Sequence, residues 1–158
     1  MAVDVFLKIK GIPGESSDSK HKGEIDVLSY SWGITQTGTM SYGGGGGAGK
    51  ANFGDFHFMM RMNKATPKLM QVCANGSHIE EAILVCRKAG DKQQEYMQYK
   101  FYDLLVSSYQ TSASSEEPTE SISFNFSKME MEYKEQDAKG QLGGATGFKY
   151  NIKENKQY

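Results

Sequence analysis

Alternation of apolar and polar residues with a period of two is the feature that most restricts the fold of this chain. Side chains on a β-strand point to opposite faces in turn, so such alternation is typical of half-buried strands. The sequence predicts strands at 3–9, 25–37, 53–62, 81–88, 96–109, 122–133 and 148–152. Segment 81–88 is apolar on both faces and is expected to be a central strand. Strands do not alternate regularly with helices, so the sequence predicts a mainly β fold, either a β-barrel or a β-sandwich.

A single segment has helical spacing. Thr66 followed by Pro67 is typical of a helix start, and Leu69, Val72 and Cys73 then form one apolar stripe. Gly76 suits the end of the helix. A helix of about ten residues is too short to be stable alone, so we expect it to pack on the sheet.

Two strand segments have features of their own. In segment 25–37 the even positions are large and apolar and are expected to be buried, whereas Ser29 and Ser31 should face the other way. These apolar positions are Leu28, Tyr30, Trp32 and Ile34. In segment 122–133 the apolar residues change from even to odd numbers near Ser127 and Lys128, which we interpret as a β-bulge.

Residues 43–50 form a glycine run that ends in Gly49-Lys50. The run nearly matches a phosphate-binding loop, but Ala51 occupies the position of the hydroxyl that would bind magnesium. The residues that follow alternate like a strand, whereas a phosphate-binding loop opens a helix. We therefore expect no nucleotide here, and instead a long loop between two strands that a partner orders.

Composition points to one domain covering residues 1–158 and gives no sign of a charged partner. The 18 basic and 19 acidic residues nearly cancel, so a nucleic-acid-binding excess is missing. The N-terminus does not read as a secretory signal, and no apolar run is long enough to cross a membrane. The expected location is the cytoplasm. Cys73 and Cys86 have no metal-ligand spacing; they could pair, but two separate buried thiols are the commoner outcome in a reducing compartment.

Catalytic and metal-binding signatures are weak. Asp55 and His57 lie two residues apart on one strand face, but no third partner is evident, so we expect a solvated pair. His21 and His78 lie in loop-like contexts and are expected to be exposed. The sequence therefore predicts no enzyme, no metal site and no cofactor.

Short motifs are spread in a fixed order along nearly the whole chain. They are Gly14-Glu15-Ser16, Asp18, His21, Glu24-Ile25-Asp26-Val27, Ser31-Trp32-Gly33, Gly49-Lys50, Thr66-Pro67-Lys68-Leu69, Arg87-Lys88-Ala89-Gly90, Leu105-Val106-Ser107-Ser108 and Pro118-Thr119-Glu120. In order and spacing the chain resembles the haemolysin-coregulated protein (Hcp) family, the tube subunits of type VI secretion systems.

The resemblance implies a β-barrel with one flanking helix, which closes into hexameric rings that stack head-to-tail into a tube. That tube lies in a contractile sheath, carries a VgrG spike, holds small effectors in its lumen and is fired from the cell. Ejection would explain export of a cytoplasmic protein without a signal peptide. The alternative is a free binding module of the same fold that belongs to no tube.

Within that framework the sequence suggests two functional regions. Small hydroxyl side chains suit a smooth bore, so Ser29 and Ser31 are expected to face the lumen and its cargo. The glycine run is expected to lie where rings stack: Gly43, Gly44, Gly45, Gly46, Gly47, Gly49 and Lys50.

Overall fold

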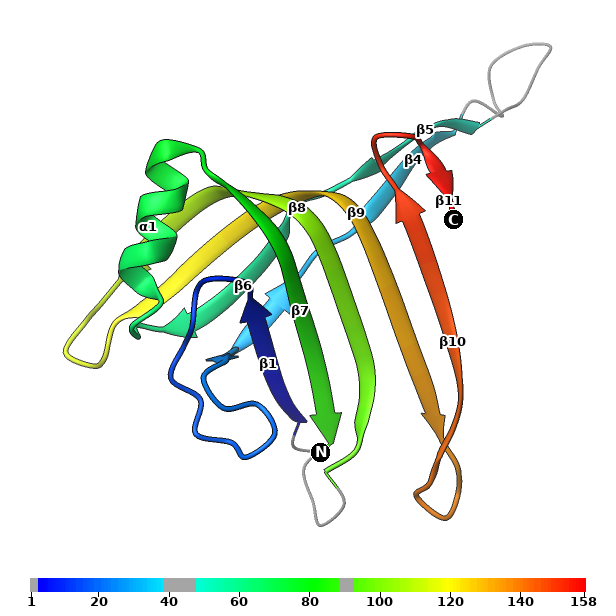
Figure 1. Cartoon of the computed structure of the whole chain (residues 1–158), viewed down its shortest axis with the longest axis horizontal. Coiled ribbons are helices and arrows are strands. Elements are labelled where there is room, and N and C mark those ends of the chain that lie inside the picture. The colour runs from blue at the N-terminus through cyan, green and yellow to red at the C-terminus, as the bar shows by residue number, and fades with distance from the viewer. Residues whose placement is uncertain (1–2, 39–47, 89–92) are drawn as a thin grey trace.

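The computed structural model describes residues 3–38, 48–88 and 93–158. This part of the chain forms eleven strands and one helix (Figure 1). The elements are β1 (Val3–Ile9), β2 (Ile25–Asp26), β3 (Ser29–Ser31), β4 (Ile34–Gly38), β5 (Ala48–Phe53), β6 (Phe56–Arg61), α1 (Thr66–Asn75), β7 (His78–Lys88), β8 (Glu95–Ser112), β9 (Thr119–Gln136), β10 (Leu142–Asn151) and β11 (Lys156–Gln157).

The predicted mainly β fold with one short helix is confirmed. Nine strands form one antiparallel sheet with the path β11-β10-β9-β8-β7-β1-β2, to which β6 adds by pairing with β9, and β3 by pairing with β6. The sheet curls strongly, and α1 covers one end of it (Figure 1). In the described residues no backbone pairing joins β2 to β11. The segment that carries β2 and β3 instead bridges two strands, because the Val27 amide donates to Val5 O of β1 and the Leu28 amide donates to Met59 O of β6.

The long strands β8 and β9 belong to both halves of this curled sheet. The first half of β8 pairs with β7 and the second half of β9 pairs with β10. The first half of β9 pairs instead with β6, which carries β3 on its other edge. The β8–β9 ladder is therefore shared by two layers, one with β7 and β10 and the other with β6 and β3.

Both strands exchange their inner and outer faces where the layers meet. In β8 the buried residues pass from Phe101 to Leu104, and in β9 from Phe126 to Met129. The pairing register is the same on either side of this point, because Tyr102 faces Lys128 and Leu104 faces Phe126. The expected change of face near Ser127 is thus confirmed, but its interpretation as a β-bulge is wrong, since both strands bend together without an extra residue.

Asp103 occupies the centre of this bend and has a left-handed backbone with φ of 52°. Its carboxylate gathers donors from three other segments: His78 Nδ1 at 2.8 Å, Lys153 Nζ at 2.9 Å and Ser127 Oγ at 2.9 Å. The same three contacts hold the pKa of the Asp103 carboxyl well below its usual range. Asp tolerates positive φ better than most residues, and here its side chain also joins the strands that bend.

The register shift of this ladder lies elsewhere, between Val106 and Ser108. An extra residue in one strand of a pair bends that strand and redirects its side chains. Here the irregularity exposes the side chain of Ser107 beside Ser108, so two neighbouring hydroxyls contact Ser123 of β9.

The segment predicted as one strand over 25–37 is broken into β2, β3 and β4. β3 pairs with β6, whereas β4 leaves the sheet to pair with β5 as an arm that projects from the body (Figure 1). The arm separates from the sheet at Gly33, between β3 and β4, and at Gly54, between β5 and β6. The Gly54 amide donates to the Gly33 carbonyl at 2.9 Å. One straight strand could not serve both partners, because the sheet and the arm run in different directions.

The break changes which side chains are covered. Tyr30 and Trp32 are half-buried against the core as expected, but Leu28 and Ile34 are 45% and 44% exposed, so their predicted burial is wrong. The core of the curl is instead filled by aromatic side chains of β6, β8 and β9 that touch one another: Phe56, Phe58, Phe101, Phe124 and Phe126.

The helix lies where the sequence placed it. Leu69 and Val72 are buried, and Gly76 ends the helix with φ of 69°. Ala65 holds the N-cap position, so Thr66 is the first residue of the helix and does not cap it through its side chain. The Thr66 hydroxyl accepts from the Asn63 amide at 3.2 Å and donates to the buried carboxylate of Glu120 at 2.5 Å. This contact ties the first turn of α1 to β9.

Replacing Asp103 with Ala should lower the free energy of unfolding by about 1–3 kcal/mol, since the acceptor is lost while the left-handed backbone is kept. Asp103→Asn should cost less, because Asn tolerates positive φ and keeps one acceptor oxygen. Urea unfolding of the two variants at neutral pH measures the difference. Equal stability of wild type and Asp103→Ala would show that the bend does not depend on this side chain.

Candidate functional surface: a hydroxyl-rich sheet face

The outer face of the layer β3–β6–β9–β8 is covered by small hydroxyl side chains. Residues directly opposite one another in an antiparallel sheet share a face, so the register defines rows across the strands. One row is Ser31, His57, Ser123 and Ser108, and the next is Ser29, Met59, Ser121 and Gln110. Ser123 belongs to this face by register but is only 3% exposed. A third row holds Arg61, Thr119 and Ser112. We call these three rows the hydroxyl face.

The opposite side of the same strands is core. Tyr30, Phe58, Ile122 and Tyr109 face one another across the four strands and are buried or half-buried. The alternation that was read from segment 25–37 is therefore correct for β3, where Ser29 and Ser31 are both exposed.

The hydroxyl face is hollowed around the two predicted serines. An open depression of about 440 Å³ lies over β3 and β6. Its lining consists of Ser29, Tyr30, Ser31, His57, Phe58, Met59 and Ser121. Sequence reasoning found the first strand of this surface but missed β6 and β9, because cross-strand neighbours cannot be identified before the register is known.

Hydrogen bonds link the hydroxyls at one side of the face. The Ser107 hydroxyl donates to Asp55 Oδ2 at 2.6 Å, and Ser123 Oγ lies 2.8 Å from Ser107 Oγ and 2.6 Å from Ser108 Oγ. Asp55 thus has a serine partner from β8, which the sequence did not indicate. The carboxylate accepts this bond at the end of a chain of hydroxyls, which stabilises its negative charge without neutralising it.

The glycine run lies mostly beyond the described residues. Gly43, Gly44, Gly45, Gly46 and Gly47 fall outside them, whereas Gly49 and Lys50 belong to β5 in the arm, with Lys50 exposed. Ala51 and Asn52 pair with Gln36 and Thr35 as a strand. The backbone after Lys50 therefore has strand geometry, unlike the helix that follows a phosphate-binding loop.

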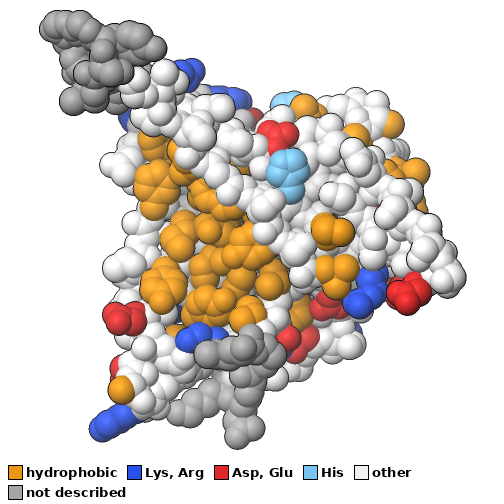
Figure 2. All heavy atoms as spheres, turned by 180° about the vertical axis from the view of Figure 1, so that it is seen from behind, with side chains coloured by type: hydrophobic (Ala, Val, Ile, Leu, Met, Phe, Trp, Pro, Cys, Tyr) orange, Lys and Arg blue, Asp and Glu red, His pale blue; other side chains and the backbone are white. Residues whose placement is uncertain are grey.

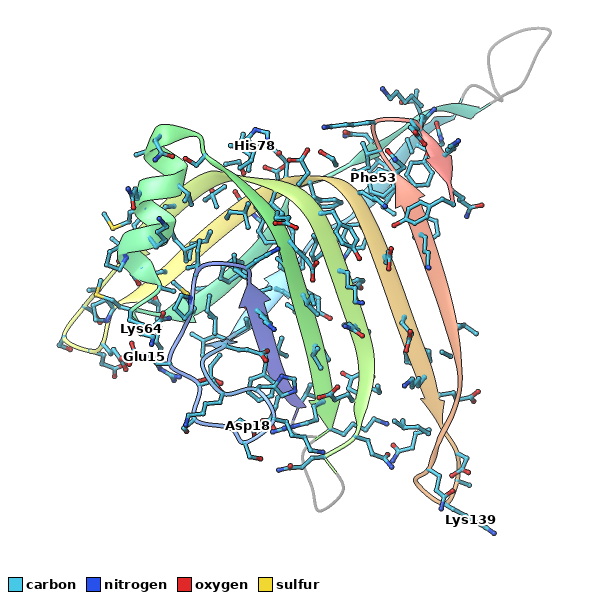
Figure 3. All side chains as sticks on the ribbon, in the orientation of Figure 1. Glu15, Asp18, Phe53, Lys64, His78 and Lys139 are labelled. Atoms are coloured by element: carbon cyan, nitrogen blue, oxygen red, sulfur yellow. The ribbon has the colours of Figure 1, made fainter. Side chains whose placement is uncertain are left out.

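A second surface is apolar. Half-buried aromatic side chains continue the core toward β10. Trp32 packs edge-on against Tyr99, and the ring centroids of Phe53 and Tyr150 lie 4.9 Å apart. Phe148 stacks on Tyr150 in turn. Hydrophobic side chains gather broadly on the face seen from behind (Figure 2), and Phe53 lies where the arm meets the body (Figure 3). We call these five side chains the aromatic row: Trp32, Phe53, Tyr99, Phe148 and Tyr150.

A buried ionic cluster holds the loop between β1 and β2. Arg87, only 2% exposed, donates to both carboxylate oxygens of Asp18 at 2.9 and 2.8 Å and to Asp4 at 3.0 Å. The guanidinium of Arg87 lowers the pKa of Asp18 to about 2. Asp18 lies in the loop that crosses the lower end of β1 in Figure 3. Asp18 and Arg87, which both belong to the short motifs of the sequence analysis, thus have a structural role in holding this loop.

His21 belongs to the same loop, and its expected exposure is wrong. The ring is 6% exposed, stacks on Phe6 at 4.3 Å, and places its two nitrogens 3.0 Å from Glu24 and 2.6 Å from Glu95. His78, in contrast, is exposed as expected. Gly14 lets this loop fold closely, since a Cβ there would lie 2.5 Å from the Glu24 carbonyl oxygen.

Metal binding finds no support in residues 3–38, 48–88 and 93–158, where no three His, Cys, Asp or Glu side chains could hold an ion together. Cys86 is buried and Cys73 is half-buried, and both are free thiols. Among the described residues, no helix is both long and apolar enough to cross a bilayer.

Comparison with known proteins places this architecture in one family. Residues 6–133 match the family model described as type VI secretion system effector, Hcp. Protein hcp1 of Pseudomonas aeruginosa is 45% identical over 161 aligned positions that cover 99% of both chains. The crystal structure of Hcp1 from Salmonella typhimurium is 41% identical, covers 100% of both chains and superposes with a TM-score of 0.85.

Another solved structure, titled as a type six secretion system protein, is 31% identical, covers 99% of this chain and 100% of its own, and has a TM-score of 0.92. The chain therefore belongs to the Hcp family of secreted type VI secretion system proteins, the family of the tube subunit. The resemblance inferred from the short motifs is confirmed.

Proposed function

We propose that the protein forms six-membered rings that stack head-to-tail into the inner tube of the secretion apparatus, with the hydroxyl face lining the bore. The observation that carries this proposal is the hydroxyl face itself. Four neighbouring strands present mainly serine, threonine and glutamine around an open depression, with His57, Met59 and Arg61 among them. Such a wall offers hydrogen bonds to a passing protein, but few large apolar side chains to retain it.

The charge of the hydroxyl face fits a bore that admits cargo of either sign. Charged groups are few: Arg61 lies 3.7 Å from Glu117, and the Asp55 carboxylate keeps its negative charge while accepting a hydrogen bond from Ser107. The chain as a whole has a net charge of −1. Selection of cargo by long-range electrostatic attraction would therefore be weak.

The arm and the aromatic row supply the subunit contact in this proposal. A two-stranded hairpin is at best marginally stable in water, and every described residue of β4 is exposed. Ile34 of the arm and the aromatic row leave apolar surface uncovered, which in a soluble protein usually marks a contact site. A neighbouring subunit could cover this surface, and a heterologous contact of this kind closes into a ring when its rotation allows.

The glycine run, which lies between β4 and β5 in the sequence, would contact the next ring, and small effectors would be carried inside. The tube would end in a VgrG spike, lie in a contractile sheath and leave a cytoplasmic assembly site by ejection. The role is structural and involves no catalysis or cofactor. A free binding module of the same fold is the alternative, and its oligomeric state distinguishes it.

Light scattering of the purified protein at micromolar concentration should give six times the 17.5 kDa monomer mass. Ile34→Glu should release folded monomers, because it places a charge in the proposed contact. Met70→Glu, at a residue of α1 that is 48% exposed, is the matched control and should keep the ring. A natively folded wild-type monomer would favour the free module over the tube subunit.

Substitution of Ser31 by Gln adds bulk to the open depression and should impair cargo binding. Since the side chain is exposed, stability should change by no more than about 0.5 kcal/mol and the ring should persist. A pull-down of a small effector of the same system should retain roughly tenfold less, equivalent to about 1.4 kcal/mol. Ser77→Gln, exposed just after α1, is the control. Unchanged binding removes Ser31 from the bore, and a lost ring places it at a subunit contact.

Deletion of residues 43–48 should leave the ring intact while weakening stacking and secretion. The deletion removes residues between β4 and β5 together with Ala48, the first residue of β5, and shortening a loop changes its closure cost by only about 0.6 kcal/mol for each halving of length. Electron microscopy would show single rings in place of stacks. An unfolded product would mean that the glycine run supports the barrel itself.

A further inference from the structure

Met59 differs from all other residues of the hydroxyl face. In the described residues of the three rows it is the one apolar side chain, and it is 40% exposed. It projects from β6 between Ser29 and Ser121, at the wall of the open depression. Its neighbours in sequence, Phe58 and Met60, point inward and are 1% and 0% exposed. β6 therefore contributes its inward neighbours to the core, whereas the Met59 side chain lies on the opposite face.

The chemistry of methionine suits a contact with varied partners. Its side chain is unbranched and its sulfur polarizable, so it adapts to apolar surfaces of different shape. Around Met59 the hydroxyls of Ser29, Ser31 and Ser121 can donate or accept hydrogen bonds. Together these groups match a polypeptide surface, which presents apolar side chains between backbone and side-chain polar groups.

The charges around Met59 argue against nucleic acid as the occupant. A surface that binds phosphate backbones needs several Lys or Arg side chains, because neutralised phosphates supply most of that affinity. Within the three rows the one such residue is Arg61, which is already near Glu117. The near-neutral, hydroxyl-lined surface fits protein cargo.

We propose that Met59 is the residue through which the bore recognises protein cargo, by contact with an apolar side chain exposed on the effector. The proposal rests on the placement of the hydroxyl face in the bore. A ring of six subunits would present six such methionines on an otherwise hydrophilic wall. Cargo would then be held weakly at several equivalent points and could still slide.

Oxidative footprinting tests this directly, because the chain carries its own controls. Met59, Met62 and Met70 are 40%, 45% and 48% exposed, so a mild peroxide treatment reaches all three at comparable rates. Mass spectrometry would compare empty rings with rings purified together with a co-expressed small effector of the same system. We expect the effector to slow the oxidation of Met59 several-fold and to leave Met70 unchanged.

Two results would overturn the inference, and they are distinguishable. Equal oxidation of Met59 in loaded and empty rings would mean that cargo does not contact it, while the bore itself could still be lined by the hydroxyl face. Protection of Met59 already in the empty ring would place it at a subunit contact, which contradicts the proposed function as well.

Substitution supplies a second test. Met59→Leu keeps an apolar side chain and should retain effector binding, whereas Met59→Gln has a similar length without the apolar surface and should bind roughly tenfold less. Met70→Gln on α1 is the control. All three variants should melt like wild type, since the substituted side chains are exposed. Full effector binding by the Met59→Gln ring would overturn the inference.

Discussion

The bend of the β8–β9 ladder at Asp103 is the constraint on which the rest of the structure depends. Both strands exchange faces there without losing register, so a single pair of strands serves two layers. The left-handed backbone of Asp103 and its contacts to His78, Ser127 and Lys153 hold this change of direction in place. Without it, one long flat ladder would expose either its aromatic side chains or its backbone edges.

Two different outer surfaces result from this bend. Beyond it, β8 and β9 join β6 and β3, and the outward side chains are mainly hydroxyls. On the other side of the bend, the inner face of the curled sheet ends in the aromatic row, next to the base of the arm. A subunit with one hydrophilic wall and one uncovered apolar side is suited to a ring, in which the apolar side meets a neighbour and the hydrophilic wall faces a channel.

Sequence reasoning predicted the parts that depend on local pattern. The mainly β fold, the helix ending at Gly76 and the exposure of Ser29 and Ser31 follow from periodicity and turn chemistry. The burial of Leu28, Ile34 and His21 was predicted wrongly, because it depends on distant partners. β4 leaves the sheet for β5, and His21 meets Glu95, which is 74 residues away. Met59 and Ser121 joined the candidate surface only once the register was known.

Electron cryomicroscopy of the assembled ring would show directly which face of the subunit lines the channel. We expect six subunits with Ser29, Ser31, Met59 and Ser121 facing the channel, and with the aromatic row covered by the adjacent subunit. A map in which the hydroxyl face is turned outward, or is buried between subunits, would contradict this expectation.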